Sequence, residues 1–178
     1  MQTGNSKAFV ALVDSALARG LQPGRARPVQ LAQARALAGD PERADSAAEV
    51  FRNLLQGAGG EGAADSEAFA VFLSRAERTP KRVDDHRWLF RHRLEHASDP
   101  AGVLLEWAHA EETLFESPKT ARKLYREVLE RDPERTDALS ELARLQAASG
   151  DAKGALESLD SLVTRVEPEA RSAVELRR

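Results

Sequence analysis

Apolar residues recur at helical spacing along most of the chain, and glycine, proline and aspartate divide it into short segments. Ser117 and Pro118, for example, place an N-cap and a first-turn proline before one apolar stretch, which ends at Asp132 and Pro133. The pattern predicts about ten helices joined by short turns. Their expected ranges are 6–19, 29–38, 40–55, 65–78, 83–97, 100–115, 117–132, 134–149, 151–166 and 168 to the C-terminus.

Two segments interrupt the helical pattern. Residues 21–28 contain Pro23 and Pro28 and are predicted to form a loop, because a proline in a helix interior removes a hydrogen bond. The glycine-rich segment 56–62 (QGAGGEG) is predicted to be a flexible hinge.

Composition favours a fold made only of helices. The chain has 31 alanines, no isoleucine and few valines. Alanine is the strongest helix former, whereas β-branched residues favour strands. Short helices joined by short turns pack as antiparallel neighbours. The sequence therefore predicts an all-α fold built from antiparallel helix pairs.

The helix pairs repeat, and the period is 34 residues. In units that start at Gly102 and Thr136, a small residue is expected where the two helices cross, and larger apolar residues are expected in the layer between units. The small residues are Ala121 and Ala155; the larger ones are Tyr125, Val128 and Leu129 in the first unit and Leu159, Leu162 and Val163 in the second. A weaker unit near residue 25 carries Ala44, Ala48 and Phe51 in the same register.

This register resembles that of the tetratricopeptide repeat (TPR) family over residues 102–168, and more weakly over 25–178. The segment 106–129 also resembles the half-a-TPR (HAT) variant. The residues that carry the HAT resemblance are Trp107, Ala108, Glu111, Glu112 and Ala121, Arg122, Lys123, Leu124 and Tyr125. The resemblance implies an α-solenoid, a right-handed superhelix whose concave groove is lined mostly by the first helix of each pair.

The expected organisation follows from these units. It comprises a leading helix and loop (1–24), a weak pair (25–58), a degenerate pair after the hinge (59–99), a TPR- or HAT-like repeat (102–135), a TPR repeat (136–168) and a capping or truncated helix (169–178). The truncated form is favoured slightly, as a piece of a longer array. Exposed repeat ends would allow two copies of the chain to pair.

The resemblance implies a non-catalytic module or scaffold that binds a peptide or helix of a partner protein in the groove. The groove positions carried over from the family are Glu106, Ala110, Thr113, Ser140, Arg144 and Ala147. Chaperone-tail members of the family clamp a carboxylate with lysine and asparagine at such positions. Because this chain has neither residue there, we do not expect it to bind such tails.

A basic segment offers an alternative function. Residues 75–93 contain seven lysines and arginines against three acidic residues. A patch formed by Arg75, Arg78, Arg82, Arg87 and Arg91 would suit an anionic partner, as in an RNA-associated HAT-like scaffold. The other interpretation is that these cations pair with acids of neighbouring helices. Binding to nucleic acid is not the favoured expectation, because the net charge of the whole chain is −3.

Three further features of the sequence contain residues that could carry chemistry. His92, Glu95 and His96 match an H-x-x-E-H pattern. Catalytic zinc would need an α/β domain and a third ligand across a cleft, so a solvated helix face or adventitious binding of a divalent metal is expected. Glu111 and Glu112 are expected to pair with Arg122 and Lys123 on the next helix; Trp88, Trp107 and Tyr125 are expected in the core.

The remaining composition excludes several classes. The chain has no cysteine, which excludes zinc fingers, disulfide frameworks and thiol catalysis. No glycine-rich loop has phosphate-binding spacing, and no apolar run approaches the roughly 20 residues of a membrane helix. We therefore expect a protein without enzymatic activity or cofactors. An excess of arginine over lysine suggests a GC-rich bacterial genome, and a cytoplasmic location is expected.

Overall fold

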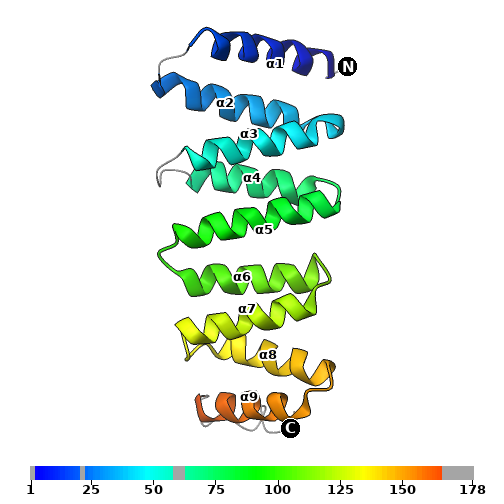
Figure 1. The fold of residues 1–178 in the computed structure, drawn as a ribbon, viewed down its shortest axis with the longest axis vertical. Helices are drawn as coiled ribbons and strands as arrows, with labels where there is room; N and C mark the ends of the chain where they lie inside the picture. Colours follow the sequence, from blue (N-terminus) through cyan, green and yellow to red (C-terminus); the bar gives the residue numbers. More distant parts are fainter. Residues whose placement is uncertain (1–2, 21–22, 58–62, 166–178) are drawn as a thin grey trace. The chain divides into compact units, whose positions relative to one another are not determined.

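The computed structural model describes residues 3–20, 23–57 and 63–165, and every regular element in them is a helix (Figure 1). The helices are α1 (Thr3–Ala18), α2 (Pro23–Ala38), the short 3-10 helix η1 (Pro41–Arg43), α3 (Ala44–Gln56), α4 (Ala63–Arg75), α5 (Pro80–Glu95), α6 (Pro100–Thr113), α7 (Pro118–Arg131), α8 (Thr136–Ala148) and α9 (Ala152–Arg165). The all-α prediction is confirmed for these ranges. The helix expected from residue 168 and most of the expected hinge lie outside the described residues.

The chain divides into two compact units, Met1–Leu89 and Phe90–Arg178, and the boundary falls within α5. In each unit consecutive helices run antiparallel and lie side by side (Figure 1). The closest approaches of the backbone are between α2 and α3, between α6 and α7, and between α8 and α9. This succession of antiparallel pairs is the arrangement of an α-solenoid, as the sequence predicts.

Aromatic side chains fill the core of the first unit. The Phe51 and Phe69 rings stack with their centroids 5.1 Å apart, and the Phe69 ring lies 6.2 Å from Trp88 of α5. The described residues of α4 and α5 lack the close backbone approach of α2 and α3. The large rings of Phe69 and Trp88 therefore fill the space between α4 and α5.

Small residues bring α6 and α7 together in the second unit. Ala108 of α6 and Ala121 of α7 are completely buried, and so is Tyr125 one turn further along α7. Because alanine has only a methyl side chain, the two backbones approach closely at this level. Among the predicted repeat residues, Ala121, Tyr125, Val128, Ala155 and Leu162 are buried, whereas Leu129, Leu159 and Val163 are half-buried.

The turns are built as the sequence punctuation suggests. Asp99 caps α6, since its Oδ1 accepts a hydrogen bond of 2.9 Å from the backbone N–H of Gly102. Gly150, with φ of 81°, makes the left-handed turn between α8 and α9, a conformation that residues with a Cβ rarely adopt.

Two predictions of local structure are wrong. Residues 23–28 are helical, because α2 begins at Pro23 and continues through Pro28. Pro23 takes the first helical position, where its missing N–H costs nothing, and Pro28 lies in the second turn on the exposed side. The predicted close-crossing residue Ala44 is only half-buried; α3 begins at Ala44 after η1, and Ala47 is completely buried in its place.

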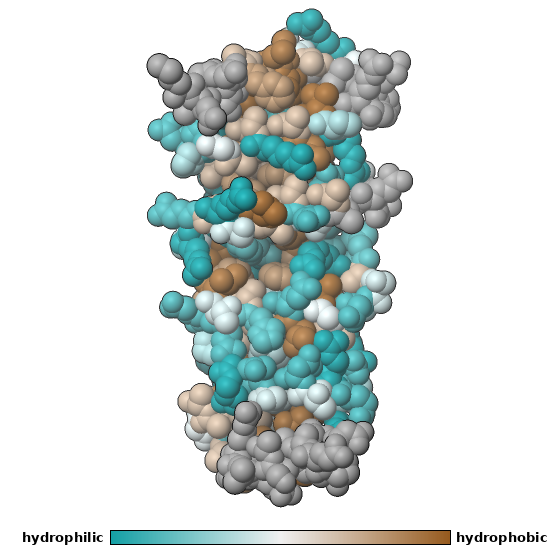
Figure 2. Space-filling model, turned by 180° about the vertical axis from the view of Figure 1, so that it is seen from behind, coloured by the Kyte–Doolittle hydropathy of each residue, from teal (hydrophilic) through white to brown (hydrophobic). Residues whose placement is uncertain are grey.

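Hydrophobic side chains are also exposed at one end of the first unit. Phe9 and Leu12 of α1 are 40% and 67% exposed, while Val10 and Val13 of the same helix are buried. Figure 2 shows hydrophobic residues on the surface at the α1 end of this unit. None of the described helices has the length and hydrophobicity required to cross a membrane.

Candidate partner-binding surface

One exposed arginine connects α6 with α8, the first helices of two successive helix pairs in the second unit. Arg144 of α8 lies with its Nη2 2.5 Å from Glu112 Oε1 of α6, and 2.7 Å from Glu141 Oε2 of α8. Hydrogen bonds to Glu112 and Glu141 raise the pKa of Arg144 above its ordinary value. The contact links α6 to α8 at the surface, beside the α7 helix that separates them in the sequence.

A second ion pair joins α5 to α6. The Glu106 carboxylate accepts from Arg93, with 2.7 Å between Oε2 and Nη2. The Arg93 guanidinium lies over the ring of Phe90, 5.6 Å from its centroid, and the Phe90 ring stacks on Trp107. The exposed Glu106 carboxylate is therefore oriented by Arg93, which in turn is positioned by the stacked rings of Phe90 and Trp107.

The six groove positions expected from the family differ in exposure. Glu106, Thr113, Arg144 and Ala147 are exposed, and Ser140 is half-buried. Ala110 is only 7% exposed, so it offers little surface to a partner. The Thr113 hydroxyl donates to the backbone carbonyl of His109 at 2.7 Å, and Thr113 is the last residue of α6. A partner on this surface would therefore meet mainly charged and small side chains.

The predicted pairing of Glu111 and Glu112 with Arg122 and Lys123 is wrong. Glu111 is completely buried and accepts a hydrogen bond of 2.9 Å from Trp107 Nε1. Glu112 pairs with Arg144 instead, and Arg122 donates to Ser149 Oγ at 2.5 Å. The two glutamates lie on different faces of α6, because adjacent helical residues are about 100° apart.

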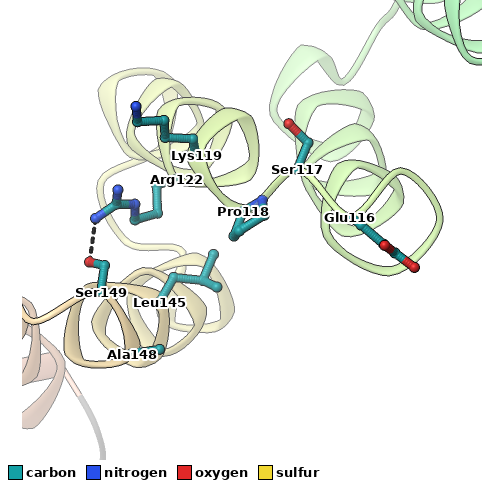
Figure 3. Close-up of a pocket in the computed structure, with 8 residues that line it drawn as sticks. All are labelled: Glu116, Ser117, Pro118, Lys119, Arg122, Leu145, Ala148 and Ser149. Carbon is teal, nitrogen blue, oxygen red and sulfur yellow. Dashed lines mark hydrogen bonds between the residues drawn. The ribbon is translucent and has the colours of Figure 1, made fainter. Parts of the chain in front are cut away.

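The structure also has a surface pocket that the sequence did not indicate. Its volume is about 360 Å³, and it lies between the turn before α7, the start of α7 and the end of α8 (Figure 3). Leu145 and Ala148 give it apolar surface, and Lys119 and Arg122 flank it with positive charge. Glu116 in the turn has a φ of 51°, an uncommon conformation for a residue other than glycine. No sequence motif distinguishes these positions from ordinary repeat residues.

The arginines of the basic segment 75–93 differ in burial. Arg82 is buried and saturated: its guanidinium contacts Asp45, lies 2.8 Å from Asp85 Oδ2 and donates to the Ala44 carbonyl at 3.1 Å. Arg82 therefore does not contribute to an exposed anion-binding patch. Among the other predicted members, Arg75, Arg78 and Arg91 are exposed and Arg87 is half-buried.

The H-x-x-E-H residues do cluster. The ligand atoms of His92, Glu95 and His96 all lie within 4.8 Å of one another at the end of α5. Burial, followed by the positive charge of His96, lowers the pKa of His92. All three side chains of this cluster come from the C-terminal end of α5 and the residue that follows it.

Comparison with known families agrees with the helix pairing. No curated protein matches the chain. Residues 115–174 match the tetratricopeptide repeat family, whose repeats generally mediate protein–protein interactions and are typically non-catalytic scaffolds. The match covers α7, α8 and α9 together with the turns between them, whereas the two units of the 34-residue period, 102–135 and 136–168, also include α6. Residues 115–174 therefore carry tetratricopeptide repeat sequence.

Proposed function

We propose that the chain is a non-catalytic interaction module that binds a peptide or helix of a partner protein on the exposed surface of α6 and α8. The observation that carries the proposal is the position of Arg144, which lies exposed between Glu112 of α6 and Glu141 of α8. The family match over α7–α9 supports it, because these repeats commonly bind proteins.

The charges of this surface suggest how a partner would be selected. Glu106 is paired with Arg93, and Glu112 and Glu141 are both paired with Arg144, so the surface presents paired charges of both signs. Charges held by ion pairs lose little conformational entropy when a partner binds, and complementary charges fix the register of a docked segment. A partner segment with the opposite pattern would exchange ion pairs with these residues.

The test is affinity capture from lysate of the source organism, with and without nuclease. The wild type is compared with a double variant, Glu106→Arg with Arg144→Glu, which reverses two charges on the surface. The matched control is Glu130→Arg with Arg126→Glu, two exposed positions of α7. Both variants leave the net charge unchanged, and circular dichroism checks that both are folded.

We expect a discrete partner protein that the wild type and the α7 control capture and the α6–α8 variant loses. Purified partner should then bind the α6–α8 variant at least tenfold more weakly, as judged by calorimetry. Equal capture by both variants would contradict the proposal. Capture of RNA that nuclease abolishes and the surface variant does not affect would instead favour the nucleic-acid alternative, with Arg75, Arg78 and Arg91 as its remaining exposed cations.

A further inference from the structure

The last turn of α5 presents three side chains of the kinds that bind transition metals. His92, Glu95 and His96 are spaced i, i+3 and i+4, so they lie on one face of the helix. Their ligand atoms lie within 4.8 Å of one another, and the two imidazole centroids are 4.6 Å apart. Two imidazole nitrogens on one zinc ion are at most about 4 Å apart, so small side-chain rotations would bring all three groups onto one ion.

The orientation of His96 favours a metal ligand. Its Nδ1 lies 2.9 Å from the backbone carbonyl oxygen of His92, and a carbonyl can only accept, so Nδ1 is the nitrogen that donates. The lone pair is then on Nε2. A hydrogen bond from the other ring nitrogen to a carbonyl is the usual support of a metal-bound histidine, because it fixes both tautomer and ring orientation.

The surrounding charges are compatible with a cation. The three residues occupy the C-terminal end of α5, where the helix dipole is negative, and Glu95 adds a carboxylate. Two arginines flank His92 in the sequence: Arg91 is exposed, and Arg93 is held by Glu106 and lies over the Phe90 ring. The charge of Arg93 is thus partly compensated by Glu106.

We propose that His92, Glu95 and His96 bind one divalent transition-metal ion of the zinc class, which clamps the last turn of α5. Two imidazoles and one carboxylate suit zinc, nickel or copper better than calcium or magnesium, which prefer oxygen ligands. Water would complete the coordination, because Glu95 and His96 are exposed. The ion would join side chains one turn apart and so oppose fraying at the point where α5 leads into the turn before α6.

The test is calorimetric titration of the full chain with Zn²⁺, together with Co²⁺ titration followed by visible absorption. We expect one ion per chain, a Co²⁺ spectrum with ligand-field bands, and a higher melting temperature with Zn²⁺. His92→Ala and His96→Ala should each raise the Kd at least tenfold, and Glu95→Gln should raise it less. The matched control is His109→Gln, which removes an exposed histidine of α6.

Circular dichroism of each variant without metal separates loss of binding from loss of fold. A second control keeps the site intact but changes the neighbouring exposed charge, Arg91→Gln, and should leave binding in place. Absence of saturable binding, or binding that persists unchanged in both His92→Ala and His96→Ala, would overturn the proposal. Equal loss in His109→Gln would also overturn it, because binding would then be an unspecific property of the histidines.

Discussion

At the scale of single residues, the buried side chains of Glu111 and Arg82 each have specific partners. Glu111 is completely buried and accepts from the Trp107 indole, and Arg82 is buried against Asp85 and the Ala44 carbonyl. Burial of such groups is unfavourable unless hydrogen bonds or opposite charges compensate it. These side chains therefore specify how neighbouring helices align, and their removal would leave a partner uncompensated.

The sequence could not predict these residue-scale contacts. Glu111 and Glu112 are adjacent and chemically alike, yet one is buried against an indole and the other is paired with Arg144. Arg82 lies in a run of cations that a linear pattern describes as one exposed patch. Which face of a helix is buried depends on its neighbours in three dimensions, and this segment lacks the clear apolar periodicity that would have indicated it.

We expect His86 to make the stability of the first unit depend on pH. Burial lowers the pKa of His86 below 6.5, although a hydrogen bond with the Leu73 backbone and the charge of Asp85 oppose the decrease; the charge of Arg78 adds to it. In the unfolded chain the histidine keeps an ordinary pKa of about 6.5 and binds the proton more readily. The free energy of unfolding should therefore fall as the pH decreases through about 6.5 toward the lower pKa of the folded state.

The measurement is urea unfolding at a series of pH values between 8 and 5, with His86→Gln as the test variant. Glutamine does not titrate, so the variant should lose stability less steeply with acid than the wild type does. Its circular dichroism at pH 8 checks that the fold is retained. An unchanged pH dependence in His86→Gln would show that other groups cause the effect.

Small residues set the helix spacing at the element scale. Ala121 of α7 is completely buried where α7 crosses α6, and Ala108 of α6 is equally buried. Replacement of Ala121 by leucine would force three additional carbon atoms into a closely packed crossing. We expect Ala121→Leu to reduce the free energy of unfolding by about 1–3 kcal/mol, measured by urea denaturation.

The matched control for this prediction is Lys123→Leu, at an exposed position of the same helix. It adds a similar side chain where there is space, so it should change stability by less than about 0.5 kcal/mol. If both variants were equally stable, the close crossing at Ala121 would not limit the packing of α6 on α7.

Helix pairing is the most predictable feature, whereas the start of α2 is not predictable from the local sequence. Gly150 and the caps at Asp99 and Asp40 mark ends that local chemistry alone determines, and the structure has turns there. The start of α2 depends on two prolines, of which only the first is at a favourable helical position. Packing of α2 against α3 evidently outweighs the hydrogen bond lost at Pro28.

At the scale of the whole molecule, a repeat array must cover or use the face of its end helix. The sequence predicted exposed repeat ends, and the structure gives their chemistry in the first unit: Phe9 and Leu12 point outward from α1. Repeat periodicity predicts the layers between units well, because each layer recurs. It does not predict what packs against an apolar helix face that none of the described helices covers.

We expect two copies of the chain to pair through this face of α1, because pairing would remove Leu12, which is 67% exposed, and Phe9 from water. Sedimentation velocity should then show an average mass that rises with protein concentration. Leu12→Glu should weaken the pairing at least tenfold, since burial of one leucine contributes about 1.5–3 kcal/mol and a buried glutamate would be unfavourable. The control is Val71→Glu on α4, where another exposed apolar residue, 44% exposed, lies outside this face. A monomeric mass at every concentration, or equal weakening by Val71→Glu, would contradict pairing through α1 and leave the helix face available to a different protein.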